Sequence, residues 1–277
     1  MAERSYPSKL LLFGEYAVIE GGEALSIPYP QFSLHWVDQK PADSETKQYL
    51  IDFLNWLKEN KFSESLKLDV FESDLNKGLD VESNIPIGYG VGSSGALVAA
   101  VYDRYCKNRI DKKNLSELKL FLGSMENYFH AQSSGLDPLV SYLQCAIHVA
   151  GNELKIIPDK IIKSSSLHFE LIDTGKKHQT SELVETFKER ISLPAYKEQF
   201  DREYLPLVKD CIKYYLDDDI IELKKLLYKL SQLQMTLFSF AIPSEAYQNW
   251  IMGLMFNNYL KLCGAGGGGF IISFTLE

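Results

Sequence analysis

The chain has 277 residues, of which 45% are hydrophobic and 24% charged, the balance of a globular protein with one or two domains. This composition excludes a disordered tail, a collagen-like repeat and a disulfide-stabilised miniprotein. The formal net charge of −8 argues against a nucleic-acid partner held by bulk charge. The four cysteines are scattered without metal-ligand spacing, and we find no signal peptide and no apolar run near the roughly 18 residues of a membrane span. We therefore expect a reduced cytoplasmic protein without a membrane partner.

The first half of the chain is predicted to mix strands and helices. Leu50, Phe53, Leu54 and Leu57 recur at helical spacing, and Asn114 begins a capping-box-like start of a later helix. Residues 66–71 alternate like an edge strand. The further expected strands are 9–13, 24–27, 32–36, 146–149 and 169–172, and the expected helices are 44–60, 96–105, 114–130 and a short one near 137.

The second half is predicted to be more helical. Helical periodicity covers 181–190, 203–216, 220–240 and 244–256, and strands are expected at 259–262 and 270–274. The irregular order of strands and helices favours an α+β fold over alternating βαβ units. We place the domain boundary between 150 and 175, which gives an N-terminal domain of residues 1–160 and a C-terminal domain of residues 161–277.

A glycine-rich loop, residues 86–95, is the first candidate site. Its glycines leave backbone N–H groups unshielded, and Ser93 and Ser94 stand where the next helix is expected to begin. A helix N-terminus has unsatisfied donors and partial positive charge, so the loop is suited to hold the phosphates of a nucleotide. A serine hydroxyl there can also bind Mg²⁺. The structural alternative is an ordinary glycine turn with Ser93 as the N-cap.

Two other nucleotide-binding patterns do not fit this loop. Gly90-Val-Gly-Ser-Ser-Gly95 matches GxGxxG, but a turn containing Pro86 precedes it instead of a buried strand. The acid expected about 20 residues further on, Asp111, lies in a polar turn. No GxxxxGK[ST] segment is present. The sequence therefore argues against a Rossmann dehydrogenase and excludes a P-loop NTPase.

Glu126 and Asp137 form the second candidate site, and residues 263–269 form the third. Phosphoryl transfer to an alcohol uses one carboxylate to hold Mg²⁺ and another to take the hydroxyl proton. Taken alone, Asp137 before a proline is also a good N-cap, and Glu126 could lie on a solvated helix face. His130 is interpreted as a packing or hydrogen-bonding residue. Four successive glycines in residues 266–269 indicate close approach of the backbone to another element or to a ligand.

Three segments in this order resemble the motifs of the GHMP kinase superfamily. They are Lys9-Leu-Leu-Leu-Phe-Gly-Glu-Tyr, Ile85-Pro-Ile-Gly-Tyr-Gly-Val-Gly-Ser-Ser-Gly-Ala and Lys261-Leu-Cys-Gly-Ala-Gly-Gly-Gly-Gly-Phe. The segments 125–137 and 172–180 are most similar to the mevalonate kinases, in particular to a short, flavobacterial-type branch. The resemblance covers residues 9–274. It implies a two-domain fold, with an N-terminal ribosomal protein S5 domain 2-like part and a C-terminal ferredoxin-like α/β sandwich.

The resemblance also implies roles for individual residues. Asp137 would accept the alcohol proton, beside Lys9, which would stabilise the developing alkoxide, and Ser94 and Glu126 would bind Mg²⁺. The phosphates of ATP would lie against Gly88, Gly90, Val91, Gly92, Ser93, Ser94 and Gly95. Supporting positions near the substrate would be Glu15, Tyr16, Thr180, Gly264, Gly266 and Gly267. The implied reaction is ATP-dependent phosphorylation of mevalonate in isoprenoid biosynthesis.

The sequence departs from this family at three points. Tyr16 stands where mevalonate kinases usually have His, which makes phosphomevalonate kinase the alternative, and Cys263 replaces the usual Thr. The family continues beyond the glycine hairpin with a helix and a strand, so we expect a C-terminal domain that lacks these elements. A non-catalytic small-molecule sensor is the alternative from another class. The oligomeric state, a homodimer included, is left open.

Overall fold

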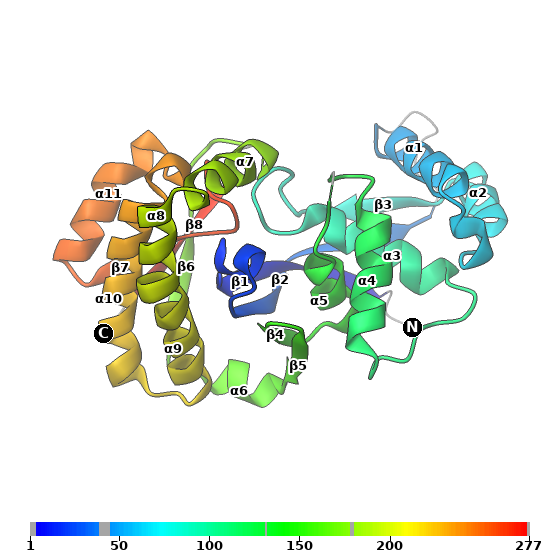
Figure 1. Ribbon diagram of the computed structural model, residues 1–277. Helices are drawn as coiled ribbons and strands as arrows, with labels where there is room; N and C mark the ends of the chain where they lie inside the picture. Colours follow the sequence, from blue (N-terminus) through cyan, green and yellow to red (C-terminus); the bar gives the residue numbers. More distant parts are fainter. Residues whose placement is uncertain (1–3, 39–44, 131, 178–179, 276–277) are drawn as a thin grey trace. The chain divides into compact units, whose positions relative to one another are not determined.

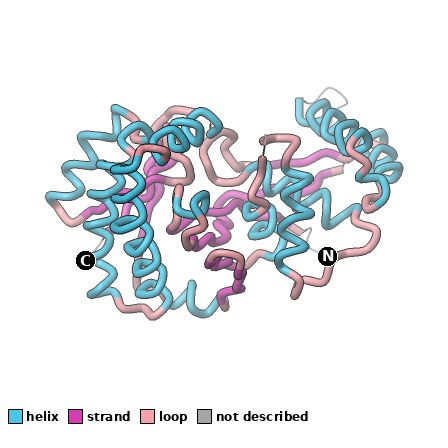
Figure 2. The backbone as a smooth tube through the Cα atoms, in the orientation of Figure 1, coloured by secondary structure: helices cyan, strands magenta, loops and turns pink. Residues whose placement is uncertain are grey.

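The computed structural model describes residues 4–38, 45–130, 132–177 and 180–275 (Figure 1). Strands and helices follow one another without a regular βαβ repeat, so the predicted α+β class is confirmed (Figure 2). The strands are β1 (Ser5–Phe13), β2 (Ala24–Val37), β3 (Asp80–Ser83), β4 (Ala146–Ala150), β5 (Glu153–Ile157), β6 (His168–Asp173), β7 (Asn258–Leu262) and β8 (Phe270–Thr275).

The described helices lie mostly where helical periodicity predicted them. They are α1 (Glu45–Glu59), α2 (Leu68–Asn76), α3 (Ser93–Tyr105), α4 (Leu115–Glu126), α5 (Leu136–Leu143), α6 (Asp159–Ser164), α7 (Thr180–Ile191), α8 (Pro194–Gln199), α9 (Leu205–Leu216), α10 (Ile220–Leu237) and α11 (Ser244–Met255). Within the described part of the chain, none of these helices is long and apolar enough to cross a membrane.

The edge strand predicted at residues 66–71 is wrong. Leu66 forms only an isolated bridge with Cys106, and α2 begins at Leu68. The apparent alternation of Leu66, Leu68 and Val70 is overridden because Leu68, Phe71 and Leu75 are buried together on one helix face. The predicted strands 24–27 and 32–36 also differ from the structure, since β2 runs unbroken through both.

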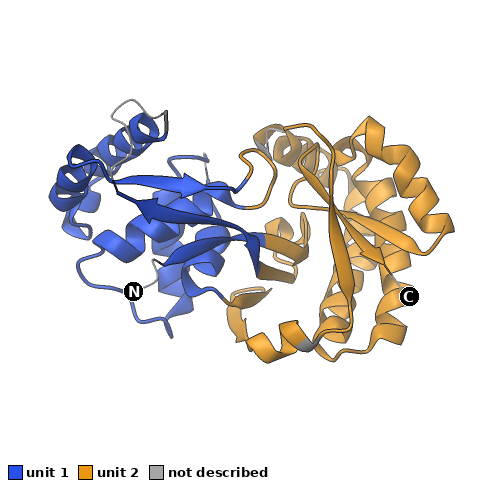
Figure 3. Cartoon of the chain, turned by 180° about the vertical axis from the view of Figure 1, so that it is seen from behind, with its two compact units in different colours: residues 1–9, 28–85, 92–144 blue, residues 10–27, 86–91, 145–277 orange. Residues whose placement is uncertain are grey.

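The chain forms two compact units (Figure 3). Unit 1 holds residues 1–9, 28–85 and 92–144, and unit 2 holds residues 10–27, 86–91 and 145–277. Strand pairing explains why the units are discontinuous in sequence: residues 24–26 of β2 pair with residues 147–149 of β4, whereas residues 34–37 pair with β3. The predicted domains, residues 1–160 and 161–277, divide the chain at one position, whereas each unit is made of several segments. The predicted boundary stays a prediction.

In unit 1, α3 is the central helix and packs against α4 and α5. It is buried from Gly95 to Asp103 and again at Tyr105. Ala96, Ala99 and Ala100 are fully buried, and their small side chains let neighbouring helices approach closely. Gly95 is the tightest point, since a Cβ there would lie 2.8 Å from the Cβ of Asp137. This packing sets the start of α3 beside the start of α5.

In unit 2, the antiparallel sheet has the strand order β6-β8-β7. α10 and α11 pack on β7, and α9 packs on α10. Ile271, Ile272 and Phe274 of β8 are nearly fully buried, so both faces of this strand are covered. The other sheet of the chain has the order β1-β2-β4-β5, with β3 paired to β2. β1 and β2 each pass from one unit to the other along their length.

Candidate active site

Lys9 and Asp137, which the sequence predicts to act together, form an ion pair in unit 1. The Nζ atom of Lys9, on β1, lies 3.1 Å from Oδ1 of Asp137, in the first turn of α5. The Lys9 side chain is 8% exposed and that of Asp137 is 30% exposed. The ammonium group is therefore almost out of water, while the carboxylate that it stabilises stays open to a ligand.

The N-cap interpretation of Asp137 is wrong. The N-cap of α5 is Gly135, which has a φ of +72°, and Asp137 is the second residue of the helix. A Cβ on Gly135 would lie 2.1 Å from the carbonyl oxygen of Lys119, so both the backbone angle and the space require glycine. The Asp137 side chain is thus available to pair with Lys9.

Glu126 is buried at the end of α4 and is held by two serines. Ser94 Oγ donates a hydrogen bond of 2.9 Å to Oε1, and Ser133 Oγ donates to Oε2. Ser133 Oγ also accepts a 2.9 Å bond from the N–H of Gly135, which connects this carboxylate to the turn before α5. His130 Nε2 lies 3.1 Å from Ser94 Oγ. Glu126 therefore does not lie on a solvated helix face.

The environment raises the pKa of Glu126 to about 7. Burial is the largest cause and the negative charge of Asp137 the second, whereas the two serine hydroxyls and Lys9 act in the opposite direction. Near neutral pH this carboxyl group thus exchanges between its protonated and ionised forms. A cation that binds the carboxylate competes with a proton for it.

A divalent cation fits the donor set of Ser94 and Glu126. Hydroxyl and carboxylate oxygens are ligands that Mg²⁺ prefers, and Mg²⁺ commonly takes only one or two protein ligands beside substrate phosphates. Among the described residues, no group of three or more His, Cys, Asp or Glu side chains could hold a metal ion.

The start of α3 has the geometry of an anion-binding helix end. Gly92 is its N-cap with a φ of +78°, and no side chain caps the first turn. A Cβ on Gly92 would lie 3.0 Å from Cγ of Lys9 and 3.4 Å from Oδ2 of Asp137. The backbone thus approaches the ion pair as closely as a glycine permits, and Ser93 and Ser94 open the helix directly behind it.

In unit 2, the glycine-rich residues 264–269 pack against residues 89–90. A Cβ on Gly264 would lie 3.3 Å from the carbonyl oxygen of Gly90, and one on Gly269 would lie 2.6 Å from Cα of Tyr89. Gly266 is equally restricted, since a Cβ there would lie 2.5 Å from the carbonyl oxygen of Ala241. These glycines are required for close backbone packing.

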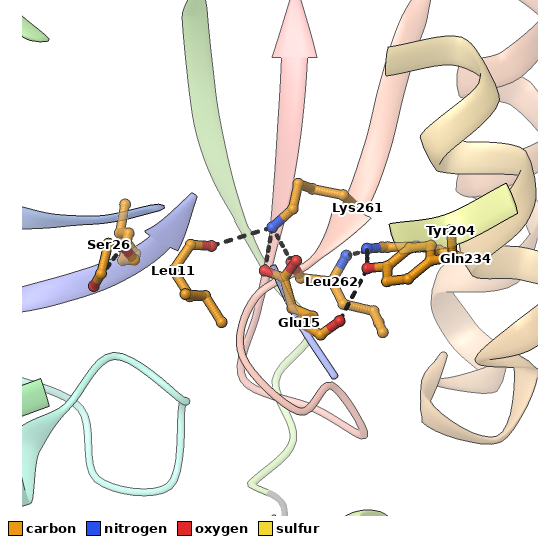
Figure 4. A network of polar contacts seen from close by, with 8 residues as sticks. Leu11, Glu15, Ser26, Tyr204, Gln234, Lys261 and Leu262 are labelled. Carbon is orange, nitrogen blue, oxygen red and sulfur yellow. Dashed lines mark hydrogen bonds and ion pairs between the residues drawn. The ribbon is translucent and has the colours of Figure 1, made fainter. Parts of the chain in front are cut away.

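Glu15 and Tyr16 lie in the turn that follows β1, and they contact the strand β7 and the glycine segment within unit 2. The Tyr16 hydroxyl donates 2.6 Å to the carbonyl oxygen of Ala265, and its ring packs on Phe187 and Phe238. Figure 4 shows Glu15 facing Lys261, whose ammonium group also donates to the carbonyl oxygens of Leu11 and Leu262. The side chain of Thr180, the first residue of α7, lies outside the described residues.

Three residues of these networks were not assigned a site role from the sequence. Ser133 belongs to the predicted Ser-Ser-Gly-Leu-Asp turn, and Lys261 opens the third motif. Both positions lie inside segments that the sequence marks by their resemblance to the GHMP kinase motifs. His130 was interpreted as a packing or hydrogen-bonding residue, and the structure gives it a hydrogen bond to Ser94.

Comparisons with known proteins place these features in a family context. Residues 56–144 match the profile described as GHMP kinases N terminal domain. No curated protein sequence matches the chain. The mevalonate kinase of Methanococcus jannaschii superposes with a TM-score of 0.66 at 18% identity, over 99% of this chain and 90% of that one.

Two further solved structures carry small-molecule ligands. The mevalonate kinase of L. major, in complex with R-mevalonate, has a TM-score of 0.68 and 18% identity, over 100% of this chain and 88% of that one. The phosphomevalonate kinase of Streptococcus pneumoniae, in complex with phosphomevalonate and AMPPNP, has a TM-score of 0.68 and 16% identity, over 100% and 93%. Identities this low show the fold alone. The predicted resemblance to the superfamily and its fold is confirmed, while the flavobacterial-type branch stays a prediction.

Proposed function

We propose that this chain, which has the GHMP kinase fold and carries the GHMP kinases N terminal domain profile in residues 56–144, transfers a phosphoryl group from ATP to the hydroxyl of a small-molecule alcohol. The observation that carries the proposal is the ion pair between buried Lys9 and partly exposed Asp137 beside the start of α3. The ammonium group holds the carboxylate in position, and the exposed carboxylate can accept a proton from a bound hydroxyl.

In this proposal, Asp137 accepts the proton of the acceptor hydroxyl. Lys9 holds the carboxylate in place and stabilises the negative charge that develops on the alcohol oxygen. The backbone N–H groups at the start of α3 bind phosphate oxygens, because a helix N-terminus offers unsatisfied donors and partial positive charge. The contribution of these residues is positioning and charge stabilisation, the terms that dominate phosphoryl transfer.

Ser94 and Glu126 would hold Mg²⁺, with Ser133 fixing the second carboxylate oxygen. A bound Mg²⁺ neutralises charge on the phosphates of the nucleotide. The role of Gly88, Gly90 and Val91 in phosphate binding stays a prediction, as does any substrate contact of Thr180. The packing of Gly264 and Gly266 in unit 2 supports their role as parts that shape the loop.

For the acceptor, we propose mevalonate, and phosphomevalonate is the alternative. Solved structures with this fold bind R-mevalonate in one case and phosphomevalonate in another. Tyr16 is the residue that motivates the alternative. Its hydrogen bond to Ala265 and its contacts with three phenylalanine rings give it a structural role within unit 2 that requires no phosphorylated acceptor. The sensor alternative predicts nucleotide binding without turnover.

The substitution Asp137→Asn tests the proposal. The amide keeps the shape of the side chain but cannot accept the proton, so we expect turnover to fall by about 10²–10⁴-fold, the usual contribution of a general base. Binding of AMPPNP, measured by calorimetry, should stay within about threefold of the unsubstituted chain.

Asp69→Asn is the matched control, because Asp69 is also the second residue of a short helix in unit 1 and is exposed. It should leave turnover unchanged. Normal turnover by Asp137→Asn, together with a lower melting temperature than Asp69→Asn, would assign Asp137 a structural role and overturn the proposal.

A further inference from the structure

Ser94 has two hydrogen-bond partners but a single proton. Its Oγ atom lies 2.9 Å from Oε1 of Glu126 and 3.1 Å from Nε2 of His130. A serine hydroxyl donates one hydrogen bond and can accept through its two lone pairs. With the proton directed at Glu126, the bond occupies the carboxylate oxygen that would face a cation.

A cation at Glu126 changes where this proton can lie. The positive charge repels a hydroxyl hydrogen that points toward the same carboxylate oxygen, and it attracts the lone pairs of Ser94. The hydroxyl must then rotate and donate elsewhere. His130 Nε2 is within hydrogen-bond distance and accepts such a bond when the imidazole is neutral with its proton on Nδ1.

The surrounding hydrogen bonds give the two serines different roles. The other oxygen of Glu126 is occupied by Ser133, whose hydroxyl in turn accepts from the N–H of Gly135. Ser133 therefore orients the carboxylate, and the Ser94 hydroxyl is the group that can rotate its proton away from Glu126.

We propose that His130 is a positioning residue whose Nε2 atom accepts a hydrogen bond from the Ser94 hydroxyl when Glu126 binds the divalent cation, and so turns the Ser94 lone pairs toward that cation. This inference rests on the proposed function and deepens it. His130 does not touch the cation, and its effect passes through Ser94. Partners that orient a metal ligand in this way change metal affinity by about 10–100-fold when they are removed.

The test compares His130→Phe, which removes the acceptor, with His130→Gln, whose amide oxygen can reach the position of Nε2. AMPPNP binding is measured by calorimetry over a series of free Mg²⁺ concentrations. We expect His130→Phe to raise the half-saturating Mg²⁺ concentration by about tenfold, and His130→Gln to stay within about threefold of the unsubstituted chain. AMPPNP affinity without Mg²⁺ should be the same in all three.

Two further variants separate positioning from a general loss of structure. His35→Phe is the control, since His35 lies in unit 1 on β2 and pairs with Glu82. It should not change the Mg²⁺ titration. In a Ser94→Ala background, His130→Phe should have no further effect on Mg²⁺, because the hydroxyl through which it acts is gone.

Three results would overturn the inference. They are an unchanged Mg²⁺ requirement in His130→Phe, an equal loss in His130→Phe and His130→Gln, and a full effect of His130→Phe without the Ser94 hydroxyl. If the unsubstituted chain binds AMPPNP without any dependence on Mg²⁺, the proposed metal site fails and the inference fails with it. If the unsubstituted chain binds AMPPNP in a Mg²⁺-dependent way and His130→Phe does not change this dependence, the inference about His130 is contradicted and the proposed metal site is not.

Discussion

Glu126 combines burial, a neighbouring negative charge and two serine donors, and the balance raises its pKa to about 7. The folded chain therefore holds a proton on this carboxyl group at pH values where the unfolded chain has lost it. Stability from this group is present at low pH and declines as pH rises from the ordinary glutamate range to about 7. This direction is opposite to that of a carboxylate stabilised by an ion pair.

We predict that Glu126→Gln removes this decline in the absence of Mg²⁺ and nucleotide. One pKa unit corresponds to about 1.4 kcal/mol, so the difference between the two proteins should change by on the order of 3 kcal/mol between pH 5 and pH 8. Urea unfolding at a series of pH values measures it. Parallel stability curves for the two proteins would contradict the raised pKa.

Lys9 is nearly buried beside Asp137, and this position determines its proposed role in catalysis. Its side chain is 8% exposed, and its ammonium group contacts Asp137 at 3.1 Å. We predict that Lys9→Met lowers turnover by at least about 100-fold, since the alkoxide and the carboxylate both lose their cation. Kinetics at saturating ATP and mevalonate measure this. Turnover within a few-fold of the unsubstituted chain would show that Asp137 acts without Lys9.

At the scale of elements, the start of α3 depends on glycine for two separate reasons. Gly92 has a φ of +78°, and a Cβ there would crowd Lys9 at 3.0 Å. Gly21 has nearly the same φ, +76°, and a Cβ there would meet nothing within 4 Å. An alanine at either position would therefore carry the same backbone strain. Only an alanine at position 92 would also crowd a neighbouring side chain.

We predict that Gly92→Ala and Gly21→Ala each lose about 1 kcal/mol of stability, the usual penalty of a left-handed alanine. Only Gly92→Ala should also weaken AMPPNP binding and turnover, by about tenfold or more, because it displaces the ion pair. Thermal unfolding and calorimetry distinguish the two effects. Equal loss of binding in both variants would mean that strain alone explains the result.

The turn that follows β1 and the strand β7 are joined in unit 2 by a buried ion pair. Glu15 and Lys261 have side-chain exposures of 0% and 1%, and Figure 4 shows the neighbouring Tyr204 and Gln234 that extend the network. The Tyr204 hydroxyl donates to the carbonyl oxygen of Glu15, and Gln234 donates to Tyr204. Loss of one charge would leave the other buried without its counter-ion.

We predict that Lys261→Met destabilises the protein by about 3–5 kcal/mol, whereas the double variant Glu15→Gln, Lys261→Met recovers part of that loss. Lys163→Met is the control, because Lys163 pairs with Asp159 on the surface of α6 and should lose less than about 1 kcal/mol. Urea unfolding measures all three. A Lys261→Met loss no larger than that of the control would show that the buried pair contributes little.

At the scale of the whole molecule, the periodic helices and the strands β4, β6, β7 and β8 could be predicted from sequence, whereas β3 and β5 could not. α9, α10 and α11 lie within a few residues of their predicted ranges, since each buries one apolar face. β3 has only four residues and exists through its pairing with β2, which no local pattern reveals. The error at residues 66–71 has the same origin, because a short apolar run fits either period.

The candidate site likewise has a part that could be predicted from sequence and a part that could not. The first motif suggested Lys9 and the segment 125–137 suggested Asp137, and folding brings these two side chains together. The hydrogen bonds of Ser94 with Glu126 and His130 depend on how α4 ends beside the start of α3. That geometry arises from helix packing and could not be predicted from spacing in the sequence.

Phosphoryl transfer to an alcohol is tested most directly by ADP release with Mg·ATP and four separate acceptors: mevalonate, phosphomevalonate, homoserine and galactose. We predict turnover with mevalonate, and phosphorus NMR should show a new phosphate monoester in equal amount to ADP. Turnover with phosphomevalonate instead would keep the reaction and correct the acceptor. No ADP release with any of the four, while AMPPNP still binds, would contradict the proposed reaction and favour the non-catalytic sensor.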